Sequence, residues 1–483
     1  MEHNDIQKSL YRHIFKYIGV FGSVQGLTVL LSLIRNKIAV VLLGSEGLGL
    51  SSLLNSVSKL ISDTSGLGLN VSAVKHISSF YDASDEGKLR RAILLVRSWS
   101  LLAAILGMAV CMLSSFWVSR LLFDNYDYVV VFMLLSVVVA FTAVTVGEIA
   151  ILKSTRKIVQ LARVSVYNVI LSILITTPVY YFFGIRGIIV ALILIALAQM
   201  LVTLSVSCRF YPYQIKFEKV FLREGSPVVR MGLFFVVASV LASLSDVLIR
   251  SYFTRYADLE VLGYYNSGYM LVFIYGGMVF SAMDSDYFPR LSSVHGLGGE
   301  LRGVVNRQIE VSVLLIGPMV ALMILVMPVV IPLLFKVDFL VVLQLSQIAM
   351  LSLLMRAVYL PVEYISLSRG DSLTFFVQEF IACLMLIAGV IGGYHYHSFT
   401  GIGVGIAVSS FFEVCFVLIY SRLKYGYTLS FANILHLAFF LFLLTLLAFA
   451  LLFFHGAAVV VVNVVVLLIT MLYSLYFLRK LMK

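Results

Sequence analysis

Residues 35–79 differ from the sequence around them and run RNKIAVVLLGSEGLGLSSLLNSVSKLISDTSGLGLNVSAVKHISS. Most of this stretch is apolar, yet it contains Arg35, Lys37, Lys59 and Asp63. Ionisable side chains in such surroundings are costly, so we treat them as functional candidates whose partners have to be found. A second stretch with a comparable plan, residues 250–293, suggests that the chain consists of two halves built alike.

The composition is that of an integral membrane protein. Hydrophobic residues make up 61% of the 483 residues, charged residues make up 12%, and the mean hydropathy is +1.03. Soluble domains contain about a quarter of charged residues. The chain is long enough for about a dozen or more spanning helices of about 20 residues each. Its apolar runs are unbroken over helical lengths, which disfavours an outer-membrane barrel of short alternating strands.

Apolar runs between breaker residues and charges predict about fourteen transmembrane helices. The predicted spans are 14–34, 47–74, 93–121, 128–152, 160–182, 185–208, 229–254, 261–288, 304–335, 340–366, 373–394, 401–421, 431–454 and 457–478. These helices form two groups of six and a final pair. Residues 1–212 form an N-terminal six-helix bundle, residues 213–430 a C-terminal six-helix bundle, and residues 431–483 an extra transmembrane pair. The second bundle starts with an amphipathic linker at 213–228, which we expect on the membrane surface.

The positive charges lie mainly in alternate loops. By the predicted spans, about 26 of the 35 Lys and Arg residues lie on one side of the membrane and about seven on the other. The basic side is therefore cytoplasmic, and an even number of spans places both termini there. The net charge of +11 is explained by this topology and by anionic lipid, so we do not expect nucleic acid as a partner.

The two halves align without gaps at an offset of 214 residues. This offset places Glu46 on Glu260 and Gly49 on Gly263, although only about five of 45 aligned positions are identical. The agreement of helix starts and ends is stronger support than the identities. Each half has an even number of helices, so both enter the membrane from the same side and form a parallel repeat.

The two stretches resemble the polysaccharide exporters of the MOP superfamily, the Wzx-type flippases of lipid-linked oligosaccharides that are related to MATE transporters. The second stretch contains LGYYNSGYMLVFIYGGMVFSAMDSDYFPRLSS at residues 262–293. The matching features are the basic end of the first helix, the turn at Gly44–Gly49, the break at Gly66 and Gly68, Leu-Gly-Tyr-Tyr at 262–265, and Phe288-Pro289-Arg290. The resemblance covers residues 10–425, roughly the first twelve helices.

This resemblance implies a MATE-like, all-α fold of two six-helix bundles with a peripheral terminal pair. It also implies a flippase that moves undecaprenyl-diphosphate-linked repeat units of O-antigen, capsule or exopolysaccharide from the inner to the outer leaflet of the bacterial cytoplasmic (inner) membrane by alternating access. We expect a monomer that works with the polysaccharide polymerase and chain-length machinery, for example in lipopolysaccharide biosynthesis. The chain is not expected to be an enzyme or to need a cofactor. It contains no nucleotide-binding motif, so a proton or sodium gradient is the expected energy source.

Five basic residues are candidates for binding the diphosphate in a central, water-accessible cavity: Arg35, Lys37, Lys59, Arg250 and Arg356. Arginine binds phosphate oxygens with a planar fork, while lysine supplies a compact positive charge. The resemblance supports Arg35, Lys37 and Arg250, which match basic positions of the family. Lys59 and Arg356 are inferred from their apolar surroundings.

Carboxylates within the helices are candidates for ion coupling, because a desolvated carboxyl group binds a proton more readily. They are Asp63, Glu148, Asp246, Asp284, Glu363, Glu379 and Glu413. Asp63 is the favoured proton site. Four of these carboxylates also have a purely structural interpretation. Lys59 with Asp63, and Asp246 with Arg250, are spaced to neutralise each other along a helix. Glu148 and Glu363 are expected at helix ends, in solvent or paired with arginine.

Two other functions remain open. A MATE-type, cation-coupled multidrug antiporter would need a cavity dominated by carboxylates and aromatic residues, which the basic residues in the first, second and seventh helices disfavour. A membrane-embedded glycan polymerase or ligase would need a large external loop. The longest stretches outside the predicted helices lie on the cytoplasmic side instead, which disfavours that function as well.

Overall fold

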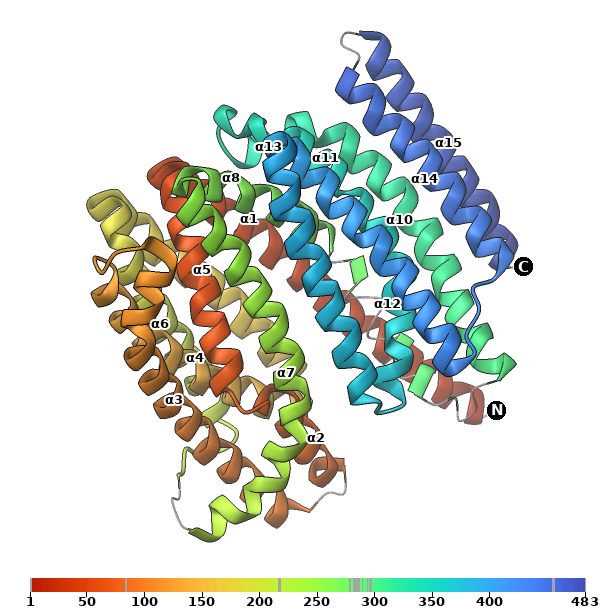
Figure 1. The fold of residues 1–483 in the computed structure, drawn as a ribbon. Helices are drawn as coiled ribbons and strands as arrows, with labels where there is room; N and C mark the ends of the chain where they lie inside the picture. Colours follow the sequence, from red (N-terminus) through yellow and green to blue (C-terminus); the bar gives the residue numbers. More distant parts are fainter. Residues whose placement is uncertain are drawn as a thin grey trace. The chain divides into compact units, whose positions relative to one another are not determined.

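The computed structural model describes residues 2–82, 85–215, 219–277, 279–280, 287–288, 290–292, 294, 298–453 and 457–482. All regular structure in this part of the chain is helical, which confirms the predicted all-α class (Figure 1). The elements are α1 (Glu2–Ser65), α2 (Leu69–Asp82), α3 (Glu86–Phe123), α4 (Val129–Ser154), α5 (Ile158–Phe183), η1 (Gly184–Arg186), α6 (Gly187–Cys208), α7 (Lys219–Tyr256), α8 (Leu259–Tyr269), the π-helix η2 (Met270–Gly276), α10 (Gly299–Leu334), η3 (Val337–Val342), α11 (Leu343–Ala349), α12 (Leu351–Ser368), α13 (Ser372–Tyr425), α14 (Phe431–Phe453) and α15 (Ala457–Met482).

The chain is a multi-pass membrane protein. Within the described residues, nine helices are long and apolar enough to cross a membrane, or up to ten with one bent pair. Three of the nine, Gly26–Ser65, Val159–Cys208 and Ser372–Tyr425, each cover two of the predicted spans. With the bent pair Val337–Ser368 and with α8, which continues into η2, the predicted set of about fourteen helices is accounted for.

The glycine breaks predicted in residues 35–79 are confirmed. The backbone of Gly44 has φ 72° and ψ −168°, which kinks α1 between the first two predicted helices. Leu67 and Gly68 have φ of 54° and 67°, and they separate α1 from α2. The offset of the predicted repeat places Gly44 on Asp258, which lies between the end of α7 and the start of α8. The break at Gly44 therefore has an equivalent in the second half.

The predicted linker is shorter than expected. The residues at 212–215 are not helical, but α7 already begins at Lys219, about ten residues before the predicted span. Propensity explains the difference, because the polar residues of 219–228 that suggested a surface linker are mostly compatible with a helix. Pro227 lies inside α7 without ending it.

The chain divides into two compact units, Met1–Glu260 and Val261–Lys483. In the first unit, α4 packs against α2, α3 and α6, while α7 packs against α1, α2 and α3. In the second unit, α12 packs against α10 and α13, and α14 and α15 lie side by side against α10 (Figure 1). The predicted boundary between residues 212 and 213 stays a prediction.

A buried ion pair ties the first unit together near the start of α3. Arg97 is 2% exposed and Glu148 on α4 is 1% exposed. Arg97 Nε lies 2.7 Å from Glu148 Oε1, and Arg97 Nη2 lies 3.0 Å from Oε2. Arg97 also donates to the carbonyl oxygens of Tyr211 at 3.0 Å and Pro212 at 2.7 Å. One guanidinium therefore joins α3, α4 and the segment that follows α6.

In the second unit, α13 is a hairpin of two helices that meet at a kink. The backbone leaves helical geometry at His397 and Ser398. On either side of the kink the two halves approach so closely that a Cβ on Gly393 would lie 2.1 Å from the carbonyl oxygen of Gly401. Close approach through small residues is typical of membrane helices, which gain stability by van der Waals packing.

Asp371 holds the open end of the same hairpin. Its carboxylate accepts a hydrogen bond from the backbone of Thr374 and lies 2.6 Å from Lys424 Nζ. The hydroxyl of Tyr425 also donates to it, at 2.8 Å. Burial by itself raises the pKa of Asp371, but the hydrogen bonds from Lys424, Tyr425 and Thr374 outweigh burial and lower the pKa to about 2. The carboxylate therefore caps the first turn of α13 and anchors its last turn.

We expect Glu148→Gln to destabilise the protein by about 3–5 kcal/mol, because it leaves the buried charge of Arg97 without its counterion. The double variant Arg97→Met, Glu148→Leu should recover most of this loss, since it removes both charges. Arg90→Ala, which breaks only an exposed contact with Glu86 at 3.9 Å, is the control and should have little effect. Thermal unfolding of the purified protein in detergent measures all three. A double variant no more stable than Glu148→Gln would contradict the assignment.

We expect Gly393→Ala to destabilise α13 by about 1–3 kcal/mol, because the new methyl group overlaps the Gly401 backbone. The neighbouring variant Gly392→Ala is a matched control, since a Cβ there meets nothing within 4 Å. It should be neutral or stabilise by about 0.4–1 kcal/mol through the loss of backbone entropy in the unfolded chain. Unfolding temperatures that shift in the same direction for both variants would argue against the close helix contact.

Candidate functional site

Two serine–aspartate hydrogen bonds join α1 to α7 in the first unit. The hydroxyl of Ser56 on α1 donates to Asp246 Oδ2 on α7, and the hydroxyl of Ser243 on α7 donates to Asp63 Oδ2 on α1. The arrangement is reciprocal, with one serine and one aspartate on each helix. Two of the predicted ion-coupling carboxylates, Asp63 and Asp246, therefore lie at the same helix contact.

Arg250 is held at this contact by Asp246. Its Nε lies 3.0 Å from both carboxylate oxygens of Asp246, and Arg250 is 4% exposed. The pairing expected from the spacing of four residues is therefore present. Asp246 accepts hydrogen bonds from both Arg250 and Ser56. The same carboxylate therefore balances the charge of Arg250 and links α7 to α1.

Arg35 and Lys37 are half-buried on α1, close to its kink. Arg35 Nη2 donates to Asn36 Oδ1 at 3.3 Å. Arg35 also lies within electrostatic range of Tyr180 on α5, a buried tyrosine that hydrogen-bonds to Ser51. These contacts give Arg35 polar surroundings within the first unit.

Lys59 differs from the expected pattern. Its side chain is exposed, and within the described residues it forms no ion pair with Asp63, which accepts the hydrogen bond of Ser243 instead. The self-neutralising pair is therefore wrong for these two residues. A spacing of four residues places both on one face of a helix, but the hydroxyl on α7 offers Asp63 a partner from the neighbouring helix.

The sequence makes Glu148 a candidate for ion coupling and does not single out Arg97. The structure instead buries both in the ion pair described above. The alternative of an arginine-paired carboxylate near a helix end is therefore confirmed for Glu148. The partner lies 51 residues away on α3, so periodicity within one helix could not indicate it. The sequence does place one positive and one negative charge in two successive apolar helices, and this pattern could have suggested the ion pair.

Arg356 lies on α12 in the second unit and is half-buried. Its guanidinium carbon lies 5.2 Å from the centre of the Phe280 ring, a cation–π contact. Its Nε is buried, and no described residue accepts a hydrogen bond from it. The π-helix η2 ends beside this arginine. A Cβ on Gly277, the residue directly after η2, would lie 3.7 Å from Arg356 Nη1. Such π-helical turns are frequent at functional sites.

Three carboxylates surround Arg356 within electrostatic range. They are Glu363 on α12 and Glu379 and Glu413 on the two halves of α13. Glu363 is 5% exposed and the other two are half-buried. All four residues are candidates from the sequence, but contacts between α12 and the two halves of α13 cannot be predicted from local patterns, so the group could not be foreseen. The last candidate carboxylate, Asp284, lies outside the described residues.

Within the described part of the chain, no group of three or more His, Cys, Asp or Glu side chains is placed to hold a metal ion. The structure thus pairs Arg250 with Asp246 at the contact of α1 with α7, where Asp63 also lies. In the second unit it places Arg356 within electrostatic range of Glu363, Glu379 and Glu413. The roles predicted for these residues in binding and coupling stay predictions.

Comparison with solved structures gives the fold. The structure of "Lipid II flippase MurJ, inward closed conformation" matches with a TM-score of 0.73 and 14% sequence identity, over 96% of this chain and 100% of that chain. An inward-facing multidrug resistance MATE family transporter of the MOP superfamily matches with a TM-score of 0.69 and 15% identity, over 83% of this chain and 94% of that one. The MATE-like fold is therefore confirmed.

A third structure is a MOP superfamily transporter from Pyrococcus furiosus, whose title states that the reverse polarity of its binding pocket suggests a different function. It matches with a TM-score of 0.53 and 13% identity, over 85% of this chain and 94% of that one. No curated protein sequence shows significant similarity to this chain.

Comparison with family models identifies the family. The model described as "Polysaccharide biosynthesis protein" matches residues 41–344, which is more than half of the chain. The match includes residues 41–79 of the first stretch and all of the second, but it begins after Arg35 and Lys37. The resemblance to polysaccharide exporters is confirmed at the level of family and fold. The chain therefore belongs to the polysaccharide biosynthesis protein family and has the fold of the MOP superfamily transporters.

Proposed function

We propose that this protein is a flippase for undecaprenyl-diphosphate-linked oligosaccharides. It would move repeat units of O-antigen, capsule or exopolysaccharide from the inner to the outer leaflet of the bacterial cytoplasmic membrane by alternating access. Membership of a polysaccharide biosynthesis family supports a glycan as cargo. The fold shared with a lipid II flippase over 96% of the chain supports a lipid-linked form of it.

The observation that carries the proposal is the presence of arginines inside membrane-spanning helices of a protein from this family. Arg356 is half-buried on α12, and its Nε is buried without an acceptor among the described residues. Arg250 is buried on α7 against Asp246. A diphosphate offers several oxygen acceptors to such donors, and each charge-assisted hydrogen bond to it contributes about 1.5–3 kcal/mol.

Energy coupling belongs to the same proposal. Three carboxyl groups lie near one arginine in the apolar interior of the second unit, so ionising all three would leave two negative charges unbalanced by that arginine among the described residues. A bound proton or sodium ion would balance them. We assign coupling to Glu363, Glu379 and Glu413, with Asp63 in the first unit as the alternative site. Asp246 is the weaker candidate because Arg250 already balances it.

The same carboxylates are the observation in favour of a second function, a cation-coupled multidrug antiporter of the MATE type. An organic cation could bind where three carboxylates outnumber one arginine. The family argues for the flippase, because its description is polysaccharide biosynthesis. The two functions differ in what a deletion strain would accumulate.

Deletion of the gene is the test of the proposed function. Loss of a flippase should lead to accumulation of a lipid-linked oligosaccharide on the cytoplasmic face, which mass spectrometry of extracted lipids identifies. The mass also gives the repeat unit. A strain that accumulates no such lipid but becomes sensitive to organic cations would instead support the antiporter.

We expect Arg356→Gln to reduce complementation of the deletion strain about ten- to a hundredfold, because it removes one charge-assisted contact to the diphosphate. The matched control is Arg422→Gln, which removes an exposed arginine from the end of α13. It should complement like the unchanged protein. The readout is surface polysaccharide, normalised to the amount of protein in the membrane. Full export by Arg356→Gln would remove Arg356 from the site.

We expect Glu413→Gln to abolish the dependence of transport on an ion gradient, because it removes one of the three charges that would bind the coupling ion. Proteoliposomes with an imposed proton or sodium gradient measure this effect against vesicles without a gradient. Glu300→Gln, at an exposed glutamate on α10, is the control and should keep the dependence. If Asp63→Asn loses the dependence while Glu413→Gln keeps it, coupling belongs to the first unit.

A further inference from the structure

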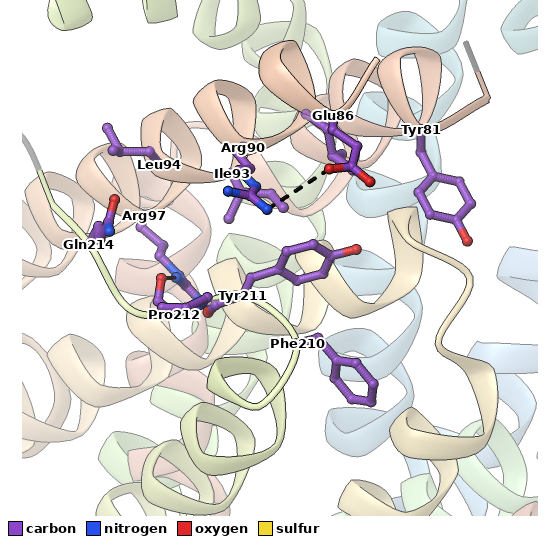
Figure 2. A pocket seen from close by; sticks show the side chains of 11 residues that line it. Tyr81, Glu86, Arg90, Ile93, Leu94, Arg97, Phe210, Tyr211, Pro212 and Gln214 are labelled. Atoms are coloured by element: carbon purple, nitrogen blue, oxygen red, sulfur yellow. Dashed lines mark hydrogen bonds and ion pairs between the residues drawn. The ribbon is translucent and has the colours of Figure 1, made fainter. Parts of the chain in front are cut away.

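A cavity of about 680 Å³ lies in the first unit, outside the groups discussed so far. It is open to the surface and is lined by the end of α2, the first turns of α3 and the residues that follow α6. Figure 2 shows the ring of Tyr211 below the pair formed by Arg90 and Glu86, with Tyr81 towards one end and Gln214 towards the other. The predicted topology places these residues on the cytoplasmic side of the membrane.

The charged groups in the wall are balanced. Arg97 is bound to Glu148 and donates to the carbonyl oxygens of Tyr211 and Pro212, so each of its three nitrogens already donates within the protein. Arg90 Nη2 lies 3.9 Å from Glu86 Oε2, and both side chains are largely exposed. The charged lining residues therefore provide no excess positive charge, so the cavity is poorly suited to a phosphate or a carboxylate.

The remaining lining is aromatic and amphipathic. Tyr81 and Tyr211 pack on a buried cluster that includes Ile77 and Ile93, so their rings are held in place. Phe210 also lines the cavity, and Lys157 Nζ lies 4.6 Å from the centre of its ring. Such rings present flat apolar faces beside polar edges. A sugar has the matching surface, since its ring carries an apolar face of C–H groups and a rim of hydroxyls.

Hydrogen-bonding groups surround these rings. Arg90 supplies donors, Glu86 supplies acceptors, and the amide of Gln214 supplies both. All three side chains are exposed, so they can turn towards a ligand without breaking a buried contact. Hydroxyl groups donate and accept, so a polyhydroxyl ligand satisfies this mixed set. The volume is typical of pockets that bind small molecules, which range over about 300–1,000 Å³.

We propose that this cavity is a docking subsite for uncharged sugar residues of the oligosaccharide before it crosses the membrane. The inference rests on the proposed function and extends it, because it assigns glycan recognition to a place separate from the arginines of α7 and α12. The subsite binds the neutral sugars of the cargo, while the diphosphate is bound elsewhere. It raises the local concentration of cargo at the cytoplasmic side of the first unit.

The test uses the full-length protein in lipid nanodiscs. The probe is the free repeat-unit oligosaccharide, released by mild acid from the lipid-linked intermediate that the deletion strain accumulates. Saturation-transfer NMR detects its binding. We expect the double variant Arg90→Ala, Gln214→Ala to bind about tenfold more weakly, since two hydrogen-bonding side chains are lost. Arg91→Ala changes the adjacent exposed arginine, which does not line the cavity, and should bind normally.

Each outcome decides between the two proposals. A deletion strain without any lipid-linked intermediate overturns the proposed function, and the subsite with it. An intermediate whose free oligosaccharide does not bind, or binds equally to all variants, overturns the subsite alone. Displacement of the oligosaccharide by inorganic diphosphate would also overturn it, because the cavity would then recognise the anion. Binding that only the double variant weakens supports the subsite.

Discussion

A lipid bilayer offers the backbone no hydrogen-bond partner, and this constraint explains most of the architecture. Each segment that crosses the membrane has to satisfy its N–H and C=O groups within its own helix. Breaks are therefore confined to positions with a specific cause. In α1 the break is Gly44, whose φ of 72° suits glycine, and in α13 it is the pair His397–Ser398.

Because the membrane interior is apolar, each charged side chain within the helices needs a partner or a function to explain it. Arg97 and Glu148 neutralise each other completely and fix three segments of the first unit, so they are explained by stability. Arg250 is balanced but sits at the contact of α1 with α7. Arg356 has a buried donor atom without a described acceptor, beside more carboxylates than it can balance. The residues least well explained by folding are thus the ones we assign to transport.

The sequence predicted the helices well because apolar runs and breakers are local signals. The starts and ends of α3 to α6 lie within a few residues of the predicted spans, except that α3 starts about seven residues early at Glu86. The start of α7 at Lys219 was missed because polarity was interpreted as a linker. The site was harder to predict, since its contacts join distant positions. The spacing of Lys59 and Asp63 suggested a pair, but the hydroxyl of Ser243 is the partner in the structure.

The reciprocal hydrogen bonds between α1 and α7 have a mechanical consequence. A serine hydroxyl sits on a single rotatable bond, so its reach is far shorter than that of a lysine or arginine. A separation of the two helices by about 2 Å would stretch both Ser56–Asp246 and Ser243–Asp63 beyond hydrogen-bonding distance. Longer side chains would follow such a shift and permit intermediate positions. With serines, the contact has two states: the two helices are either joined by both hydrogen bonds or separated.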